Sequence, residues 1–146
     1  MVRFAITQVG LWATIFGVFG GANALGINCR GNSQCKGSAR ELVGVINTIG
    51  SGSFNNGQQI ACVDGSLCAF FQGVPGGSVD AATTKNLAQK IIDHGCNSCG
   101  SVPLSDNNPA TGILTFNFVG SVCANGNVVC PDTANPPPAA TANVGK

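Results

Sequence analysis

The stretch Gln58–Gln72, QQIACVDGSLCAFFQ, predicts two short antiparallel strands joined by a tight turn. The runs Gln58–Val63 and Leu67–Gln72 are rich in apolar residues and are bounded by turn-forming residues, a pattern typical of strands. Between them lies Asp64-Gly65, a dipeptide that two-residue hairpin turns prefer. The sequence therefore predicts an antiparallel sheet built around this hairpin.

Two predicted helices flank the hairpin. From Ser38 to Ile49, apolar residues recur at spacings of three and four, and Ser38 with Glu41 has the spacing of a capping box. A second helix is predicted over 80–94, followed by Gly95, which suits a left-handed C-cap. Helices interleaved with short antiparallel strands indicate the α+β class.

Further strands are expected toward the C-terminus. Gly112–Gly120 alternates apolar and polar residues, and the apolar piece Val128–Cys130 is short enough for one more strand. The segments 73–78 and 101–112 are rich in Gly, Pro and Asn, and we expect both to be loops.

The composition limits the chain to one domain and excludes several functions. The chain has 146 residues, of which 9% are charged, and a formal net charge of +1. No basic stripe is present, which argues against a nucleic-acid partner. The length suits a single domain.

Residues 1–24 are predicted to be a secretory signal peptide. Arg3 supplies a positive start, Val9–Phe19 is an uncharged apolar run, and Ala22 and Ala24 suit a cleavage site after residue 24. The apolar run is too short for a bilayer span of about 20 residues. The mature chain would begin at Leu25, be extracellular and be formally neutral. The Pro- and Ala-rich residues 131–146 are expected to form a disordered tail.

All eight cysteines lie in the predicted mature chain, and an even number in an exported protein indicates four disulfides. Spacing alone leaves 105 pairings open. The string His94-Gly-Cys96-Asn-Ser-Cys99 admits three interpretations, namely a redox pair, half of a zinc site, or two structural disulfides. The last is favoured, because Cys96 and Cys99 follow a helix end, where the helix dipole disfavours a thiolate, and no second close pair completes a zinc site.

The sequence contains no recognisable catalytic constellation. His94 is the single histidine, and no Gly-x-Ser-x-Gly elbow accompanies it. We therefore expect a protein that is not an enzyme, with no catalytic residues, no metal and no cofactor. A sugar-binding module is also disfavoured, because the mature chain lacks Trp and Tyr. Phe70 and Phe71 straddle the two faces of one strand, which leaves one ring as a candidate for exposure.

Three blocks of sequence resemble the virally encoded killer-toxin family of the corn smut fungus. They are Leu25–Cys35 (LGINCRGNSQC), His94–Leu104 (HGCNSCGSVPL) and Gly112–Cys123 (GILTFNFVGSVC), and they occur in the family's order. The resemblance implies that residues 25–130 form a compact α+β sandwich, in which two to three helices cover an antiparallel sheet and four disulfides join the layers. It also implies the pairs Cys29–Cys96, Cys35–Cys99 and Cys62–Cys123, which leaves Cys68 for Cys130.

The same resemblance implies a function. Family toxins are secreted proteins that inhibit the growth of competing cells by blocking calcium uptake, so the expected partner is a membrane channel or transporter of a fungal or plant cell. The protein would act as a monomer that does not itself span the membrane. The candidate contacts are the basic residues of the domain, namely Arg30, Lys36, Arg40, Lys85 and Lys90.

One departure from the family leaves an alternative open. The viral toxin is basic just before the cysteine that matches Cys62, where this chain has the uncharged residues Gln58-Gln59-Ile60-Ala61. The alternative is a secreted effector or wall-associated binding protein that keeps the scaffold without blocking calcium channels.

Overall fold

The computed structural model describes residues 26–105 and 107–131. The predicted signal peptide, residues 1–24, lies outside the described residues, as does all of the predicted tail except Pro131.

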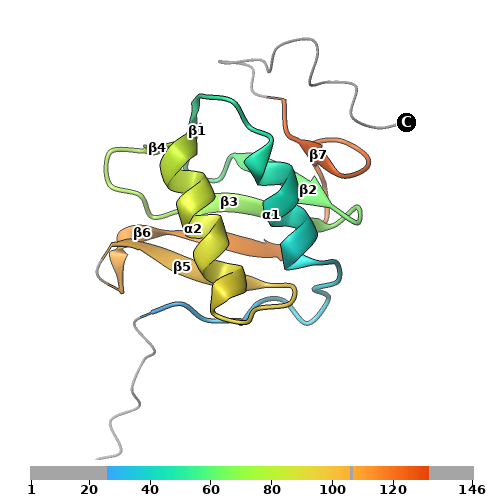
Figure 1. Cartoon of the computed structure of the whole chain (residues 1–146), viewed down its shortest axis with the longest axis horizontal. Coiled ribbons are helices and arrows are strands. Elements are labelled where there is room, and N and C mark those ends of the chain that lie inside the picture. Colours follow the sequence, from blue (N-terminus) through green and yellow to red (C-terminus); the bar gives the residue numbers. More distant parts are fainter. Residues whose placement is uncertain (1–25, 106, 132–146) are drawn as a thin grey trace, which may run out of the picture.

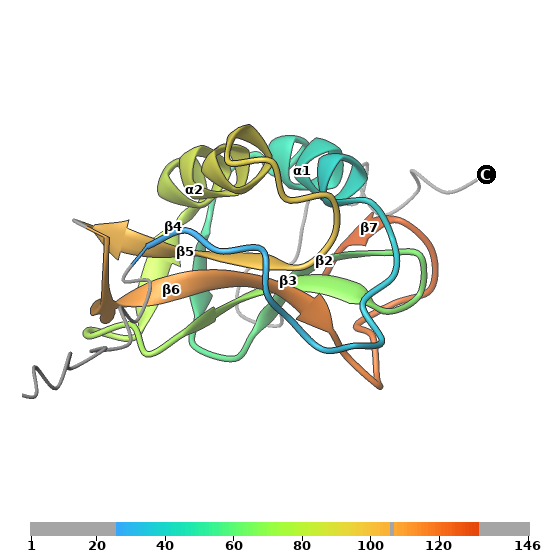
Figure 2. The ribbon, with the colours of Figure 1, turned by 90° about the horizontal axis from the view of Figure 1, so that it is seen from below.

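The fold is a two-layer sandwich of the predicted α+β class, as the family resemblance implies. Two helices, α1 (Ala39–Asn47) and α2 (Ala81–Asp93), lie side by side on one face of a five-stranded sheet (Figures 1 and 2). Helix α1 packs on the strands at one side of the sheet, and α2 packs on those at the other side. The helices leave the opposite face of the sheet uncovered (Figure 2).

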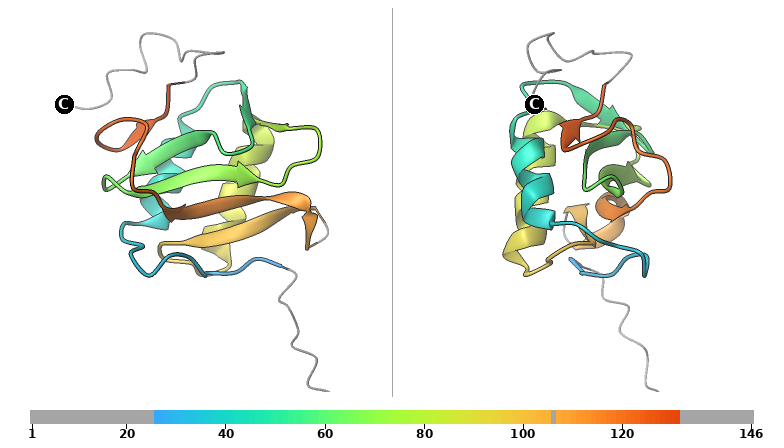
Figure 3. Two further views of the ribbon diagram at one scale, coloured as in Figure 1. Left: turned by 180° about the vertical axis from the view of Figure 1, so that it is seen from behind. Right: turned by 90° about the vertical axis from the view of Figure 1, so that its right-hand side faces the viewer.

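The main sheet is antiparallel throughout, in the order β5-β6-β3-β2-β7. A separate two-stranded sheet pairs β1 (Ser53–Asn55) with β4 (Ser78–Asp80). Figure 3 shows the main sheet from its open side. Its strands are β2 (Gln59–Val63), β3 (Leu67–Gln72), β5 (Gly100–Ser105), β6 (Asn108–Phe118) and β7 (Val128–Val129).

The central hairpin forms where the sequence predicts it. Asp64 and Gly65 both have positive φ angles, 52° and 69°, as a type I′ turn requires. Strand pairing begins at Val63 and Leu67, so three residues connect the strands where the dipeptide predicts two. Leu67, Ala69 and Phe71 of β3 point toward the helices and are fully buried. Phe116 pairs with Ala69 and is buried in the same layer. The core therefore lies between the sheet and the two helices.

Both helices begin at side-chain N-caps, and the cap of α1 is the predicted Ser38. The Glu41 backbone N–H donates to Ser38 Oγ (3.3 Å) at the start of α1, and the Thr83 N–H donates to Asp80 Oδ1 (2.9 Å) at the start of α2. Gly95 follows α2 with φ 96°, a left-handed conformation that costs glycine little. The Glu41 carboxylate does not close the predicted capping box but accepts a hydrogen bond from the Asn127 side chain.

The prediction that residues 101–112 form a loop is wrong. They contribute to β5 and β6, which form a second hairpin that turns at Asn107, a residue with φ 52°. Pro103 lies within β5 and pairs with Ile113. Proline is tolerated there because β5 is the edge strand, whose outward backbone groups need no ladder partner.

The smaller sheet was also not anticipated. Gly73–Ser78 was expected to be a loop, and its last residue begins β4, which pairs with β1. Phe54 and Val79 are paired directly across this ribbon, and both are buried. Their burial explains why two three-residue strands form in a glycine-rich region.

All eight cysteines form disulfides. The structure joins Cys29 to Cys96 and Cys35 to Cys99, the two pairs that the resemblance implies for the N-terminal segment. Both bridges connect residues before α1 with residues after α2. They therefore fix an otherwise irregular segment to the helical layer.

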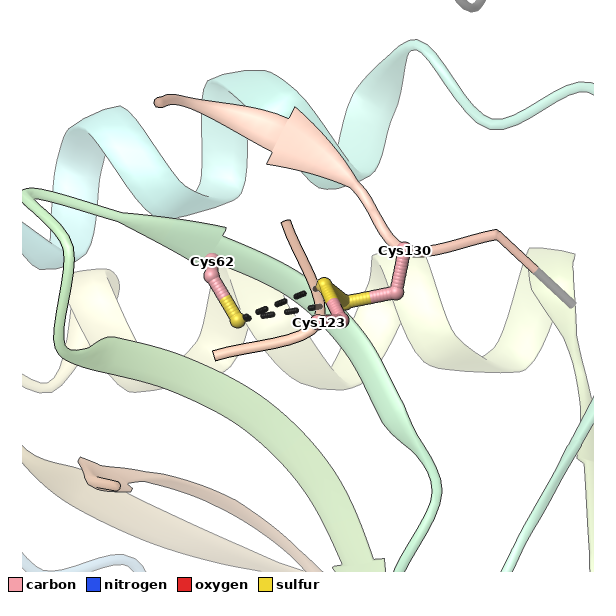
Figure 4. Close-up of side chains that lie close together, drawn as sticks. All are labelled: Cys62, Cys123 and Cys130. Atoms are coloured by element: carbon pink, nitrogen blue, oxygen red, sulfur yellow. Dashed lines mark hydrogen bonds between the residues drawn. A yellow bond between two sulfur atoms is a disulfide. The ribbon is translucent and has the colours of Figure 1, made fainter. Parts of the chain in front are cut away.

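The other four cysteines are paired differently from the expectation. The structure joins Cys62 to Cys68 and Cys123 to Cys130, in place of Cys62–Cys123 and Cys68–Cys130. The reason lies in the strand register, because Cys62 and Cys68 are direct partners across the β2–β3 hairpin. The two disulfides are in contact, since Cys62 Sγ lies 3.7 Å from Cys123 Sγ and 3.8 Å from Cys130 Sγ (Figure 4).

Candidate target-binding surface

The N-terminal segment is attached to the four-residue turn Cys96–Cys99 at three points. Cys29 is bonded to Cys96, Cys35 is bonded to Cys99, and the Ala39 N–H donates to the Asn97 carbonyl (2.8 Å). Each of these attachment residues is followed directly by a basic residue. The three basic residues Arg30, Lys36 and Arg40 therefore each follow a residue that is attached to this turn, and we call them the basic patch.

The segment that carries the patch lies flush against the domain. Asn28 and Ser101 exchange two backbone hydrogen bonds, of 3.0 and 2.8 Å. At Gly31 a Cβ atom would stand 2.4 Å from the Cys99 Cβ, and at Gly100 it would stand 2.8 Å from the Asn28 carbonyl oxygen. Both positions exclude any larger residue without a shift of the chain. The backbone beneath the patch is thus held by covalent bonds, hydrogen bonds and close packing.

A surface cavity of about 610 Å³ opens between the segment and the turn. Arg30 is the single charged residue of its lining, and Ser98 and Asn97 add polar groups on the opposite side. The Ser98 hydroxyl is buried without a hydrogen-bond partner. The full lining is Cys29, Arg30, Gly31, Asn32, Cys35, Gly95, Asn97, Ser98 and Cys99.

Two carboxylates lie near the patch and reduce its net charge. Glu41 follows Arg40 directly, and the Asp64 side chain lies beside Gly37, the neighbour of Lys36. Asn127 contacts both acidic residues, because its amide donates to Glu41 and its carbonyl oxygen accepts the Asp64 backbone N–H (3.0 Å). All three basic side chains of the patch are exposed.

The two remaining candidate residues lie apart from each other on α2. Lys85 is half-buried and Lys90 is exposed. They are five residues apart on the helix, so their side chains project in directions about 140° apart. Three of the five candidates therefore follow residues attached to one turn, and Lys85 and Lys90 lie on separate parts of the helix surface.

No catalytic arrangement forms around the histidine in the described part of the chain. His94 is the exposed C-cap of α2, and its backbone N–H donates to the Lys90 carbonyl (3.0 Å). One group of sulfurs has metal-site spacing, namely Cys62, Cys123 and Cys130, whose Sγ atoms lie within 4.8 Å of one another. All three are in disulfides, whereas a metal requires thiolates.

The contacts of Asn127 could not be predicted from the sequence. It lies in an irregular loop between Cys123 and Cys130, 86 residues away from Glu41 along the chain. Local patterns cannot find a contact of that separation. The attachment of the basic patch to one turn could be predicted only from the implied disulfides of Cys29 with Cys96 and of Cys35 with Cys99.

Among residues 26–105 and 107–131, neither helix has the length and apolar character needed to cross a bilayer. The described domain is a small, cystine-braced α+β sandwich that presents basic side chains from a covalently fixed segment.

Comparisons with known proteins agree with this class. The Kp4 family model matches residues 12–120. The KP4 killer toxin of the Ustilago maydis P4 virus is 33% identical over 109 residues, which cover 68% of this chain and 84% of that protein. The chain therefore belongs to the Kp4 family and is a killer-toxin-like protein.

Proposed function

We propose that this protein is secreted and inhibits the growth of competing fungi or plant host cells by blocking calcium uptake through a membrane channel. It acts by binding, without catalysis, and as a monomer. The observation that carries the proposal is the basic patch, in which Arg30, Lys36 and Arg40 each follow a residue attached to one disulfide-fixed turn, in a chain that belongs to a killer-toxin family.

A fixed cationic surface suits a target with an acidic outer mouth. Opposite charges across an interface accelerate association and select the partner. The binding affinity is highest when the binding groups are held in place before contact, because less conformational entropy is lost on binding. The Cys29–Cys96 and Cys35–Cys99 bridges supply that restraint to the backbone around Arg30 and Lys36.

The extracellular location rests on two independent features. Residues 1–24 have the charged start, apolar run and small-residue exit of a signal peptide. All eight cysteines are in disulfides, which form and persist in oxidising compartments.

A second candidate function is favoured by the stretch before Cys62. Ile60 and Ala61 are fully buried, and Gln58 and Gln59 carry no charge. That stretch offers a channel no cation, in contrast to the basic stretch that the viral toxin has before the matching cysteine. In this alternative the protein keeps the scaffold and binds a different surface target, as an effector or wall-associated protein.

The direct test applies purified, fully oxidised protein to fungal cultures and seedling roots, and growth is measured with and without added calcium. Growth inhibition that added calcium relieves is the expected result. The variant R30Q/K36Q/R40Q removes the basic patch and is expected to lose inhibition. The matched variant K85Q/K90Q removes basic residues from α2 and is expected to keep it.

Two results would argue against calcium-channel block. Inhibition that is insensitive to calcium would favour the second candidate function, as would inhibition that survives in R30Q/K36Q/R40Q. Absence of inhibition by protein with intact disulfides and a native circular-dichroism spectrum would remove the growth-inhibition proposal for the organisms tested.

A further inference from the structure

The face of the main sheet that the helices leave open carries no charge. None of the five strands contains an acidic or basic residue. Register places Phe70, Gln72 and Thr115 on this face, opposite in direction to the buried Phe71 and Phe116. The charged side chains of the described residues come instead from the helices, their caps, the N-terminal segment and the hairpin turn at Asp64. This face therefore offers a charged ligand no ion-pair partner.

A small cavity lies on this open face. Its volume is about 250 Å³, and it is lined by Asn56, Gly57, Gln59, Phe70, Phe71, Gln72 and Val119. The lining combines an apolar floor with three primary amides, and it includes no ionisable group. Ligand sites generally have this composition, with an apolar body and a few polar groups that fix orientation.

Phe70 is the half-buried aromatic residue of this lining. It pairs with Gln59 on β2 and with Thr115 on β6, so its ring stands on the open face between two polar neighbours. Phe71, the next residue, is fully buried on the other face. The sequence disfavours a sugar-binding module because the mature chain lacks Trp and Tyr, but a Phe ring on this face supplies the same kind of surface. The face of an aromatic ring packs against the C–H groups of a sugar ring because both surfaces are apolar.

The amides beside Phe70 retain unused hydrogen-bonding groups. Gln59 Nε2 donates to the Ser121 carbonyl (2.7 Å), while the neighbours of Gln59 Oε1 are the sulfurs of Cys62 (3.4 Å) and Cys68 (3.7 Å). Those sulfurs form a disulfide and have no hydrogen to donate. Gln59 Oε1 therefore accepts no hydrogen bond from these two neighbours, and it packs against their disulfide.

Gln72 presents the complementary group. Its Oε1 accepts a hydrogen bond from Thr115 Oγ1 (2.9 Å), which leaves the two N–H donors of Nε2 for a ligand. The cavity thus combines an acceptor, donors and an aromatic ring. Hydroxyl groups both donate and accept, so a ring that carries several hydroxyls satisfies both amides at once.

The rim of the cavity is held in place before any ligand binds. The Asn56 side chain donates to the Val74 carbonyl (3.0 Å) and accepts the Val74 N–H (2.9 Å). The Gly57 N–H donates to the Phe71 carbonyl (2.8 Å). Because these contacts fix the turn that precedes β2, little order has to be gained on binding.

We propose that this cavity binds one sugar residue of a neutral hexose polysaccharide, with the sugar ring on Phe70 and its hydroxyls on Gln59 and Gln72. The absence of charge selects against nucleic acids, phosphates and acidic polysaccharides. This site is separate from the basic patch and does not depend on calcium-channel block. It would concentrate the protein on cell-wall glucan or chitin.

The test measures binding of oxidised protein to laminarihexaose and to chitohexaose by calorimetry or NMR titration, with polygalacturonate as the acidic comparison. The two neutral arms distinguish a glucan from a chitin ligand. We expect at least one to bind, with an affinity that changes less than twofold between about 0.05 M and about 0.5 M salt, because the site has no charge to screen. Polygalacturonate is expected not to bind through this site.

Variants assign binding to the cavity. Phe70→Ala is expected to weaken binding at least tenfold, and Gln72→Ala several-fold. Gln89→Ala, which removes an exposed amide from α2, is the matched control and should bind as the parent does. Phe70→Leu keeps an apolar side chain in case Phe70→Ala does not fold, and it should also weaken binding because the aromatic face is lost.

Several results would overturn the proposal. One is no binding of either neutral oligosaccharide up to about 1 mM, a concentration that corresponds to only about 4 kcal/mol of binding free energy. Others are binding that falls steeply with salt, binding lost in R30Q/K36Q/R40Q, or a dimer that dissociates on Phe70→Ala. Failure of this test leaves the growth assay unaffected, so the two proposals are judged separately.

Discussion

Cys62 and Cys68 face each other across the β2–β3 hairpin with their Cα atoms 4.1 Å apart. This separation belongs to the closer of the two kinds of antiparallel pair, in which the side chains approach most nearly. Their bridge closes a short loop, with a sequence separation of 6, whereas Cys29 and Cys96 are 67 residues apart. The two kinds of bridge therefore have different effects on the domain.

Peptide mapping of the unreduced protein should recover Cys62–Cys68 and Cys123–Cys130. The digestion must be done at acidic pH, because thiolates exchange disulfides and these four sulfurs are in contact. Peptides that join Cys62 to Cys123 or Cys68 to Cys130 would contradict the register argument and restore the pairing that the family resemblance implies.

Removal of a long-range bridge should destabilise the domain more than removal of the hairpin bridge. In the chain-entropy model, the free energy of unfolding falls by about 4 kcal/mol in the double variant C29A/C96A and by about 2 kcal/mol in C62A/C68A. Urea unfolding under non-reducing conditions measures both. An equal or reversed ranking would mean that packing around the buried hairpin sulfurs outweighs chain entropy.

Two glycines should respond in opposite ways to alanine. Gly44 lies inside α1 with open space where a Cβ would be, so Gly44→Ala should stabilise the domain by up to about 1 kcal/mol. At Gly31 a Cβ would collide with Cys99, so Gly31→Ala should destabilise the domain and disturb the segment that carries Arg30. Thermal unfolding of the two variants compares them directly, and a neutral Gly31→Ala would show that this segment is looser than described.

Asp80 should make α2 sensitive to acid. The Thr83 hydroxyl (2.6 Å) and then the Thr83 backbone N–H (2.9 Å) donate to its carboxylate and hold the pKa of Asp80 below its ordinary value of 3.8. A lowered pKa in the folded state means that the stabilisation is present above the ordinary value and is lost as pH falls through the lowered one.

The control for this effect is Asp80→Asn, which keeps an N-cap side chain but does not titrate. We expect the stability difference between the parent and Asp80→Asn to be constant from neutral pH down to about pH 5 and to shrink below about pH 4. Urea midpoints at each pH measure it. A difference that stays constant down to about pH 2 would contradict the assigned hydrogen bonds.

The elements with local signals were predictable from the sequence. The central hairpin has its turn dipeptide, α1 has the apolar spacing and the Ser38 cap, and α2 is followed by Gly95. Strand β5 was missed because Pro103 and the neighbouring turn residues indicate a loop, and only its position at the sheet edge makes proline acceptable. The β1–β4 ribbon was missed because its strands are three residues long and depend on the burial of Phe54 and Val79.

The candidate site was only partly predictable, because its contacts join residues that are far apart along the chain. The grouping of Arg30, Lys36 and Arg40 depends on Cys29 and Cys35, whose partners came from a family resemblance and not from spacing. The contact of Asn127 with Glu41 and Asp64 depends on the path of a loop, which no local pattern encodes. The cavity at Phe70 needed the sheet register to show which of the two adjacent rings faces outward.

We propose that the basic patch blocks calcium entry into a target cell. The uptake of labelled calcium by fungal or root cells exposed to the oxidised protein measures this directly, with R30Q/K36Q/R40Q and K85Q/K90Q in parallel. We predict that the parent and K85Q/K90Q lower uptake at the concentrations that slow growth, and that R30Q/K36Q/R40Q does not. Unchanged calcium uptake in cells whose growth is inhibited by the parent protein would contradict the claim.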